Sequence, residues 1–218
     1  MPDTDPHPHV LQDYGLTQPI NIVGQIERLL PGQGVPIVFL IDENHGSDEC
    51  IKQNIANATE LVLKTGVTLI GVESHRGGLE WSDYDEGKYT TGFDMGENQE
   101  PVNTRPQFAD NMRASRAKVL GVECLGMSNQ QEPDFYEGGS WHGKPMKDHP
   151  LDRQRSEHFV RTLFELRRRH KLDGNLILNA GGDHISHIAG FIKDGIIETL
   201  AQQKAAYVRA RAPAYGNE

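Results

Sequence analysis

Acidic and histidine side chains follow the ends of four apolar runs in this chain of 218 residues. Carboxylates and imidazoles gathered in one place can take a proton from water or hold a divalent metal ion. Carboxylates that lie close together also repel one another, so a cation, a shared proton or an imidazolium must compensate them. Function is therefore expected among the side chains after these runs, which are Asp42, Glu43, His45, Glu73, His75, Glu123, Asp183, His184 and His187.

The apolar runs have the length and composition of buried strands, and helical patterns lie between them. Residues 35–41 and 67–72 form two such runs, and a helix is predicted between them because Ser47 can cap its first turn and Gly66 can end it. The same alternation continues toward the C-terminus. It predicts helices over 106–116, 151–170, 186–193 and 195–203, and strands over 118–122, 175–179 and 206–209.

This alternation predicts an α/β fold, a single domain with a mostly parallel sheet that is covered by helices on both faces and carries long loop insertions. The domain is expected over residues 35–209, with insertions at 74–104 and 124–148. An N-terminal segment, 1–34, is expected to be partly flexible, and residues 210–218 form a tail. Ligands of open α/β sheets bind beyond the carboxyl ends of the strands, so the side chains that follow the strands should meet at one edge.

Several of these residues also have an ordinary structural explanation. Glu43 or Asp183 could cap the helix that follows it, and His45 could bond to the backbone of a turn. Glu73 is harder to explain in this way, because it closes an apolar run where an unpaired carboxylate would cost several kcal/mol. Glu123 follows a similar run, and either a functional role or a salt bridge to an arginine on the longest helix would account for it.

The charge balance excludes one class of partner. The chain has 31 acidic residues against 22 lysines and arginines and a formal net charge of -9, whereas nucleic-acid-binding domains usually carry a basic surface. The one basic segment, residues 153–171, is expected to be the solvated face of a helix. We therefore expect no nucleic-acid partner.

The apolar runs and the cysteines bear on location. The longest apolar run falls well short of the ~20 residues that span a bilayer, so we expect no membrane-spanning segment. The first residues show no signal-peptide pattern, and Cys50 and Cys124 are too few for a disulfide framework. These features predict a cytoplasmic protein whose two thiols are small buried side chains, with Cys124 a minor candidate for a nucleophile or ligand.

Three short motifs together resemble those of a known superfamily. Residues 42–46 (DENHG), 71–73 (GVE) and 181–184 (GGDH) are similar to the Glu-x-His-Gly, the strand-closing Glu and the Gly-x-x-His of the erythromycin-esterase/ChaN-like superfamily, which also holds TraB and Tiki-type proteins. The resemblance spans about residues 35–192. Asp42 stands where the family commonly has glycine, and the chain is shorter than the macrolide esterases, so macrolide hydrolysis is not expected.

The resemblance implies a fold, a site and a range of activities. Some members of the superfamily look like hydrolases that activate water with glutamate and histidine, Tiki-type members look like metal-dependent peptidases, and ChaN-like members bind haem. The family also tends to carry an Arg-Asp pair that opens the helix before the last motif. The positions that match are Glu43, His45, Glu73, Gly181 and His184, with Arg153 or Arg155 as the approximate counterpart of that arginine.

The residue types themselves suit hydrolysis by an activated water. The chain contains no Gly-x-Ser-x-Gly motif, so the usual serine nucleophile of an α/β hydrolase is not expected. We expect His45 to act as the base, Glu43 or Glu73 to orient it, and His184 to face the developing oxyanion during cleavage of an ester, amide or peptide bond. The substrate is then a small molecule or a peptide. Residues expected next to these groups or to the substrate are Asp42, Glu123, Asp183, His187, Arg153 and Arg155.

The same residues leave other classes of function open. Glu43, His45, Glu73 and His184 could together hold a divalent ion such as Zn²⁺ or Mn²⁺, which would neutralise the acids and lower the pKa of a bound water. A second class is a non-catalytic module that binds a metal or haem, with the 74–104 insertion closing over the ligand. A third is a toxin-like or effector-like interaction domain.

Overall fold

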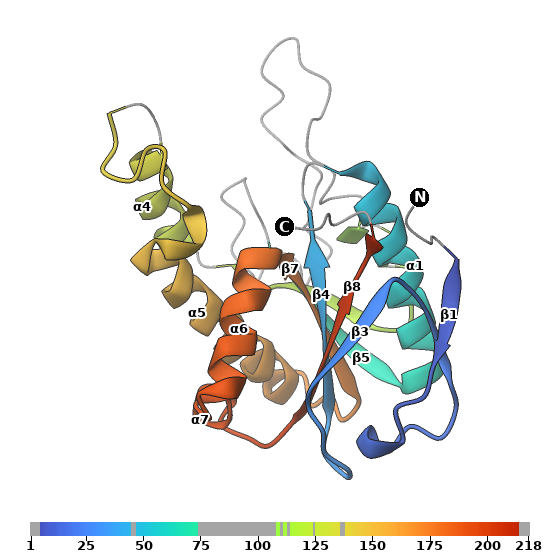
Figure 1. The fold of residues 1–218 in the computed structure, drawn as a ribbon. Helices are drawn as coiled ribbons and strands as arrows, with labels where there is room; N and C mark the ends of the chain where they lie inside the picture. The colour runs from blue at the N-terminus through green and yellow to red at the C-terminus, as the bar shows by residue number, and fades with distance from the viewer. Residues whose placement is uncertain are drawn as a thin grey trace.

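A computed structural model describes residues 5–44, 47–73, 108–109, 111–112, 114–123, 125–135 and 138–213, and it shows one α/β domain built on a mixed sheet of six strands. The order across the sheet is β3-β8-β4-β7-β5-β6 (Figure 1). The strands are β3 (Gln25–Leu30), β4 (Ile37–Glu43), β5 (Val67–Val72), β6 (Lys118–Gly121), β7 (Asn175–Gly181) and β8 (Ala206–Arg211). All neighbours are parallel except β3, which pairs antiparallel with β8 at one edge. The predicted fold class is confirmed.

Helices cover both faces of this sheet, as Figure 1 shows. Helix α1 (Asp48–Thr65) packs on one face, against β4 and β5. Helices α5 (Pro150–Arg169), α6 (Gly182–Lys193) and α7 (Ile197–Ala201) lie on the other. None of the helices in the described ranges has the length and apolar character that crossing a bilayer requires.

Local sequence signals explain where α1 begins and ends. Ser47 is its N-cap, with the side chain accepting a hydrogen bond from the Cys50 amide at 3.2 Å. Gly66 ends the helix in the left-handed conformation, at φ 70°, which glycine adopts without steric cost. Both signals were predicted. In the resulting β4-α1-β5 unit, Glu43 is the last residue of the first strand and Glu73 follows the second.

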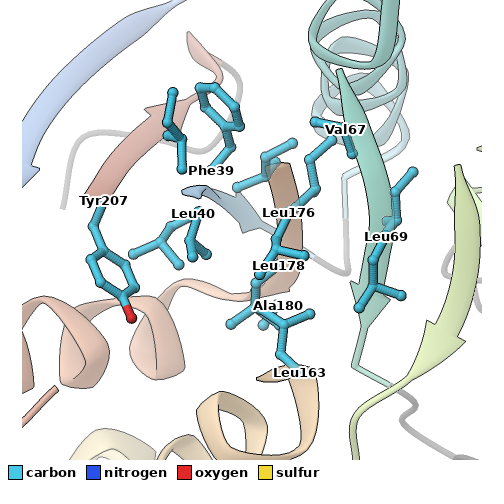
Figure 2. Packing of buried hydrophobic residues seen from close by; sticks show 14 of the residues in the cluster. Phe39, Leu40, Val67, Leu69, Leu163, Leu176, Leu178, Ala180 and Tyr207 are labelled. Atoms are coloured by element: carbon cyan, nitrogen blue, oxygen red, sulfur yellow. The ribbon is translucent and has the colours of Figure 1, made fainter. Parts of the chain in front are cut away.

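The core lies between the sheet and the helices on each face. Strand residues such as Phe39, Leu40 and Leu178 are fully buried, and Figure 2 shows Leu40 of β4 beside Leu178 of the neighbouring strand β7. Leu163 of α5 packs onto β5 at Gly71, where an added Cβ would lie 2.8 Å from its Cδ1 atom. The absence of a side chain at Gly71 therefore sets how closely α5 approaches the sheet.

The N-terminal segment contains strands that the sequence did not predict. An antiparallel pair, β1 (Pro6–His9) and β2 (Ile20–Val23), is joined by the 3-10 turn η1 (Gln12–Tyr14) and packs against α1. Strand β3 belongs to the main sheet. These strands are short, and most of β1 and half of β3 are exposed, so they lack the apolar runs that marked the central strands. At the other end, β8 continues to Arg211, past the expected strand end at 209.

The prediction of a loop insertion over 124–148 is wrong for its first half, because residues Leu125–Phe135 form the helix α4. This segment has few apolar residues and carries Pro133 inside the helix, so its helical pattern is weak. A 3-10 turn, η2 (Met146–Asp148), precedes α5. Of the predicted 106–116 helix, Phe108, Ala109, Asn111 and Met112 are helical, whereas residues 114–116 form a turn and bend, so the predicted end of this helix is wrong. The insertion at 74–104 lies outside the described residues.

Candidate functional site at the carboxyl edge of the sheet

Four neighbouring strands bring acidic or histidine side chains to the same edge of the sheet. Glu43 is the last residue of β4, Glu73 and Glu123 follow β5 and β6 within two residues, and β7 leads directly into α6, which carries His184. The four side chains belong to residues that are at most 4% exposed. Burying so many charged groups requires partners, and their contacts identify the site.

Glu73 and His184 lie together, as the sequence predicted. Oε1 of Glu73 is 3.6 Å from Nε2 of His184, and it accepts a hydrogen bond from Nη2 of Arg155 at 3.2 Å. Oε2 accepts a hydrogen bond from the backbone amide of Gly181 at 2.7 Å, at the start of α6. Both oxygens of Glu73 are therefore held, and one of them faces the histidine.

Glu43 is linked to Glu73 through Asn179 on β7. The Asn179 side-chain amide donates to Oε2 of Glu43, and its backbone oxygen accepts from the amide of Glu73 at 3.1 Å. Glu43 does not cap α1, since Ser47 is the N-cap. His45, the predicted base, and His75 lie outside the described residues. Three of the four predicted catalytic residues are thus placed at one edge of the sheet.

Glu123 forms the salt bridge that was one of its two expected explanations. Arg155 of α5 donates from Nε to Oε1 at 3.2 Å and from Nη2 to Oε2 at 2.5 Å, and its Nη1 donates to Gln131 of α4 at 2.8 Å. Burial raises the pKa of Glu123 although the Arg155 hydrogen bonds lower it, and the nearby charge of Glu73 raises it further. Burial also lowers the pKa of Arg155, but the hydrogen bonds and charge of Glu123 outweigh this and hold it above its usual value.

The expectation of a solvated basic face on α5 is therefore wrong at Arg155, which is 3% exposed. Arg153 fits that expectation. It is exposed, its guanidinium lies 4.6 Å from the centre of the Phe191 ring, and it has Glu157 as a distant ion-pair partner at 4.0 Å. Of the two arginines that could match the family position, Arg155 is the one at the site.

The sequence interpretation missed Asp152, in the first turn of α5. It is fully buried, and its Oδ1 accepts from Nε2 of Gln131 at 3.3 Å and lies 3.5 Å from Nε2 of His184. An acid in a first turn looks like an ordinary partner of the helix dipole. A usable signal was present, because Asp152, Arg155, Ser156 and Phe159 recur at three- and four-residue spacing and continue the buried stripe of this helix.

Ser156 joins two histidines of α6. Its Oγ lies 2.9 Å from Nδ1 of His184 and 3.1 Å from Nδ1 of His187, and it donates to the backbone oxygen of Asp152 at 2.9 Å. His187 Nε2 lies 2.9 Å from the backbone oxygen of Lys147. His187, expected beside the catalytic groups, is thus in contact with them.

Asp42 is bound to arginines of β8, and Asp183 lies next to His184 on α6. Asp42 is fully buried and binds Arg209 through both oxygens, at 2.7 to 3.1 Å, and it also accepts from Nε of Arg211 at 2.8 Å. Asp183 is half-buried in the first turn of α6, whose N-cap is Gly181. Of the two cysteines, Cys50 is buried as expected, and Cys124 lies outside the described residues.

No protein-family model matches the chain, and no curated protein or solved structure matches it either. The resemblance of its motifs to the erythromycin-esterase/ChaN-like superfamily therefore stays a prediction. Function has to be argued from the contacts of the site itself.

Proposed function

We propose that the chain is a hydrolase that activates water at the carboxyl edge of its sheet and cleaves an ester, amide or peptide bond. The observation that carries the proposal is the Glu73–His184 pair, 3.6 Å apart and buried, with each side chain fixed by further hydrogen bonds. A carboxylate and an imidazole held in this way supply proton transfer and stabilisation of a developing charge. Both are needed when water attacks a carbonyl group.

The contacts support a distinct role for each group. Nε2 of His184 faces carboxylate oxygens of Glu73 and Asp152, at 3.6 and 3.5 Å, so these two acids hold the ring that is proposed to face the developing oxyanion. His45 follows Glu43 by two positions and remains the proposed base. Glu43 would then orient His45, while Glu73 orients His184.

Ser156 invites comparison with a catalytic serine, because its Oγ is 2.9 Å from Nδ1 of a histidine whose other nitrogen faces carboxylates. It is fully buried, however, and its hydroxyl bonds to the backbone of its own helix, at Asp152. A nucleophile must reach the carbonyl carbon, which this position does not allow. Ser156 is better explained as the group that fixes the His184 ring, and attack by water is retained.

The test is hydrolysis of a panel of ester, amide, peptide and phosphoester substrates by the purified chain. We expect turnover in one of the first three classes and a loss of about 100-fold or more in His184→Gln, the size expected when one group that stabilises an oxyanion is removed. His158→Gln is the matched control, since His158 lies on α5 with its ring bonded to Thr162, away from the site. Absence of turnover by the wild type, or full turnover by His184→Gln, would contradict the proposal.

A binding module without turnover is the second candidate, and the buried carboxylate of Asp152 beside two histidines favours it. A visible absorption band on addition of haem, together with no hydrolysis across the panel, would support this candidate instead.

A further inference from the structure

We infer that Asp152, His184 and His187 form a binding site for a divalent transition-metal ion. Asp152 comes from the first turn of α5, and the histidines are three residues apart on α6, so they face the same side of that helix. One ligand atom from each residue lies within 4.8 Å of the other two. Two imidazoles and one carboxylate are a common ligand set for Zn²⁺, Mn²⁺ and Fe²⁺.

Both histidine rings are held in the way that metal ligands usually are. The Lys147 carbonyl can only accept a hydrogen bond, so Nε2 of His187 carries a proton. Nδ1 then keeps its lone pair for an ion, because the Ser156 hydroxyl 3.1 Å away gives its proton to the backbone oxygen of Asp152. Nδ1 of His184 bonds to Ser156, and its Nε2 points toward Asp152. A hydrogen bond from the second ring nitrogen to a fixed acceptor orients a metal-bound histidine and strengthens its bond to the ion.

The spacing of the donor atoms fits an ion better than it fits hydrogen bonds. Asp152 Oδ1 is 3.5 Å from Nε2 of His184, and Oδ2 is 3.5 Å from Nδ1 of His187. These distances exceed the normal range for an N–H···O hydrogen bond. Two ligands bound to a tetrahedral ion at about 2.0–2.2 Å lie about 3.3–3.6 Å apart, so each of these two oxygen–nitrogen distances matches a pair of ligands of one ion. With one atom from each of the three residues, the set lies within 4.8 Å.

Asp152 itself indicates a missing partner. The residue is fully buried, and within the described part of the chain its Oδ2 atom has no hydrogen bond. A buried carboxylate oxygen left in this state costs free energy, and a bound cation would remove that cost.

The charges around the site also favour a divalent ion. Three buried carboxylates, of Glu73, Glu123 and Asp152, surround the single guanidinium of Arg155. With neutral histidines this group carries two negative charges in excess. An ion with two positive charges restores neutrality in a region with little water to screen the repulsion.

The inference deepens the proposed function and rests on it for any catalytic use of the ion. A bound divalent ion would polarise the substrate carbonyl or lower the pKa of a water molecule. Metal binding itself requires no turnover, so binding is measured without a substrate.

The experiment titrates the metal-free protein with Zn²⁺, Mn²⁺ and, without oxygen, Fe²⁺, using calorimetry and elemental analysis. His7 and His9 lie two residues apart on β1, where His7 is exposed, and could bind an ion adventitiously, so both are replaced by glutamine in every variant. In that background we compare Asp152→Asn, His187→Gln and the control His158→Gln. Glutamine at 187 can still bond to Lys147 but places no donor where Nδ1 was.

We expect one equivalent of at least one of these ions to bind, and its affinity to fall by about tenfold or more in Asp152→Asn and His187→Gln but not in His158→Gln. If Asp152→Asn does not fold, the affinity of His187→Gln alone tests the inference, because the His187 side chain is partly exposed and its replacement should be tolerated. Failure of all three ions to bind, or unchanged affinity in His187→Gln, would overturn the inference. Binding without hydrolysis removes only the proposed function, whereas hydrolysis that survives without metal binding removes only the metal site.

Discussion

Arg155 on α5 and Glu123 after β6 form a buried ion pair in which Nε and Nη2 of the guanidinium each contact one carboxylate oxygen. Nη2 also reaches Glu73, at 3.2 Å, so one cation joins α5 to the ends of β5 and β6. Asp152 and Ser156 lie next to Arg155 on the same helix. The position of these side chains against His184 therefore depends on this ion pair.

Replacing Arg155 with methionine should destabilise the protein by about 3–5 kcal/mol, because Glu73 and Glu123 would remain buried without their cation. Urea unfolding followed by circular dichroism measures the change in the free energy of unfolding. Arg161→Ala is the control, since Arg161 is exposed on the same helix, and its effect should stay within about 0.5 kcal/mol. Equal effects of the two variants would refute a structural role for the pair.

The cost of Arg155→Met should shrink as the pH falls. Burial already raises the pKa of Glu123 in the native protein, and loss of the guanidinium raises it more. A carboxyl group whose native pKa lies above its unfolded value binds protons more readily when folded, so its burial costs stability at high pH and the cost is relieved in acid. The free energy of unfolding of Arg155→Met should therefore lie closer to the wild-type value at about pH 5 than at about pH 8. Adding Glu123→Gln should recover part of the loss at pH 8.

Asp42→Asn should cost about 3–5 kcal/mol, although Asp42 was expected to serve the catalytic groups. The carboxylate is the bidentate partner of Arg209, which is only 8% exposed, and its loss leaves that guanidinium without full compensation. Glu27→Gln offers a matched comparison, because Glu27 is exposed and 3.7 Å from the same arginine, so its effect should be under about 1 kcal/mol. Thermal unfolding measures both effects, and we expect a clearly lower melting temperature for Asp42→Asn than for Glu27→Gln. Similar melting temperatures would argue against a structural role for the Asp42–Arg209 ion pair.

Two glycine substitutions should change stability in opposite directions. An added methyl group at Gly71 would meet Leu163 and Val122 at 2.8 and 2.9 Å, so Gly71→Ala should destabilise the protein by about 1–3 kcal/mol. Gly190 lies inside α6 with open space around it, so Gly190→Ala should stabilise the protein by about 0.5–1 kcal/mol. Chemical denaturation gives both values, and a neutral Gly71→Ala would show that α5 can shift away from β5.

The alternation of strands and helices, and the residues that follow each strand, could be predicted because they depend on the local pattern of apolar and polar residues. The apolar runs before Glu43, Glu73 and Glu123 were long enough to mark central strands, and the carboxyl ends of parallel strands meet at one edge of the sheet. Strand order is not local, so the position of β8 beside β4, and with it the pairing of Arg209 with Asp42, could not be foreseen.

The burial of Asp152 and Arg155 likewise depends on packing between helices. Asp152 is covered because α5 packs against α4 and α6. The sequence of α4 has too weak a helical pattern to predict a helix. The face of α5 that α4 covers was therefore expected to be exposed to solvent. The same arginine-rich sequence therefore holds both a buried ion pair and exposed charges.

The most direct measurement is kcat/KM of Glu73→Gln against wild type, on the substrate of the panel that the wild type cleaves fastest. Glutamine keeps the shape of the side chain and can still accept from Gly181, so circular dichroism should be unchanged. We predict a fall in kcat/KM of about 100-fold or more, because the charge that holds His184 in place for the transition state is lost. Wild-type turnover in a folded Glu73→Gln variant would contradict the account.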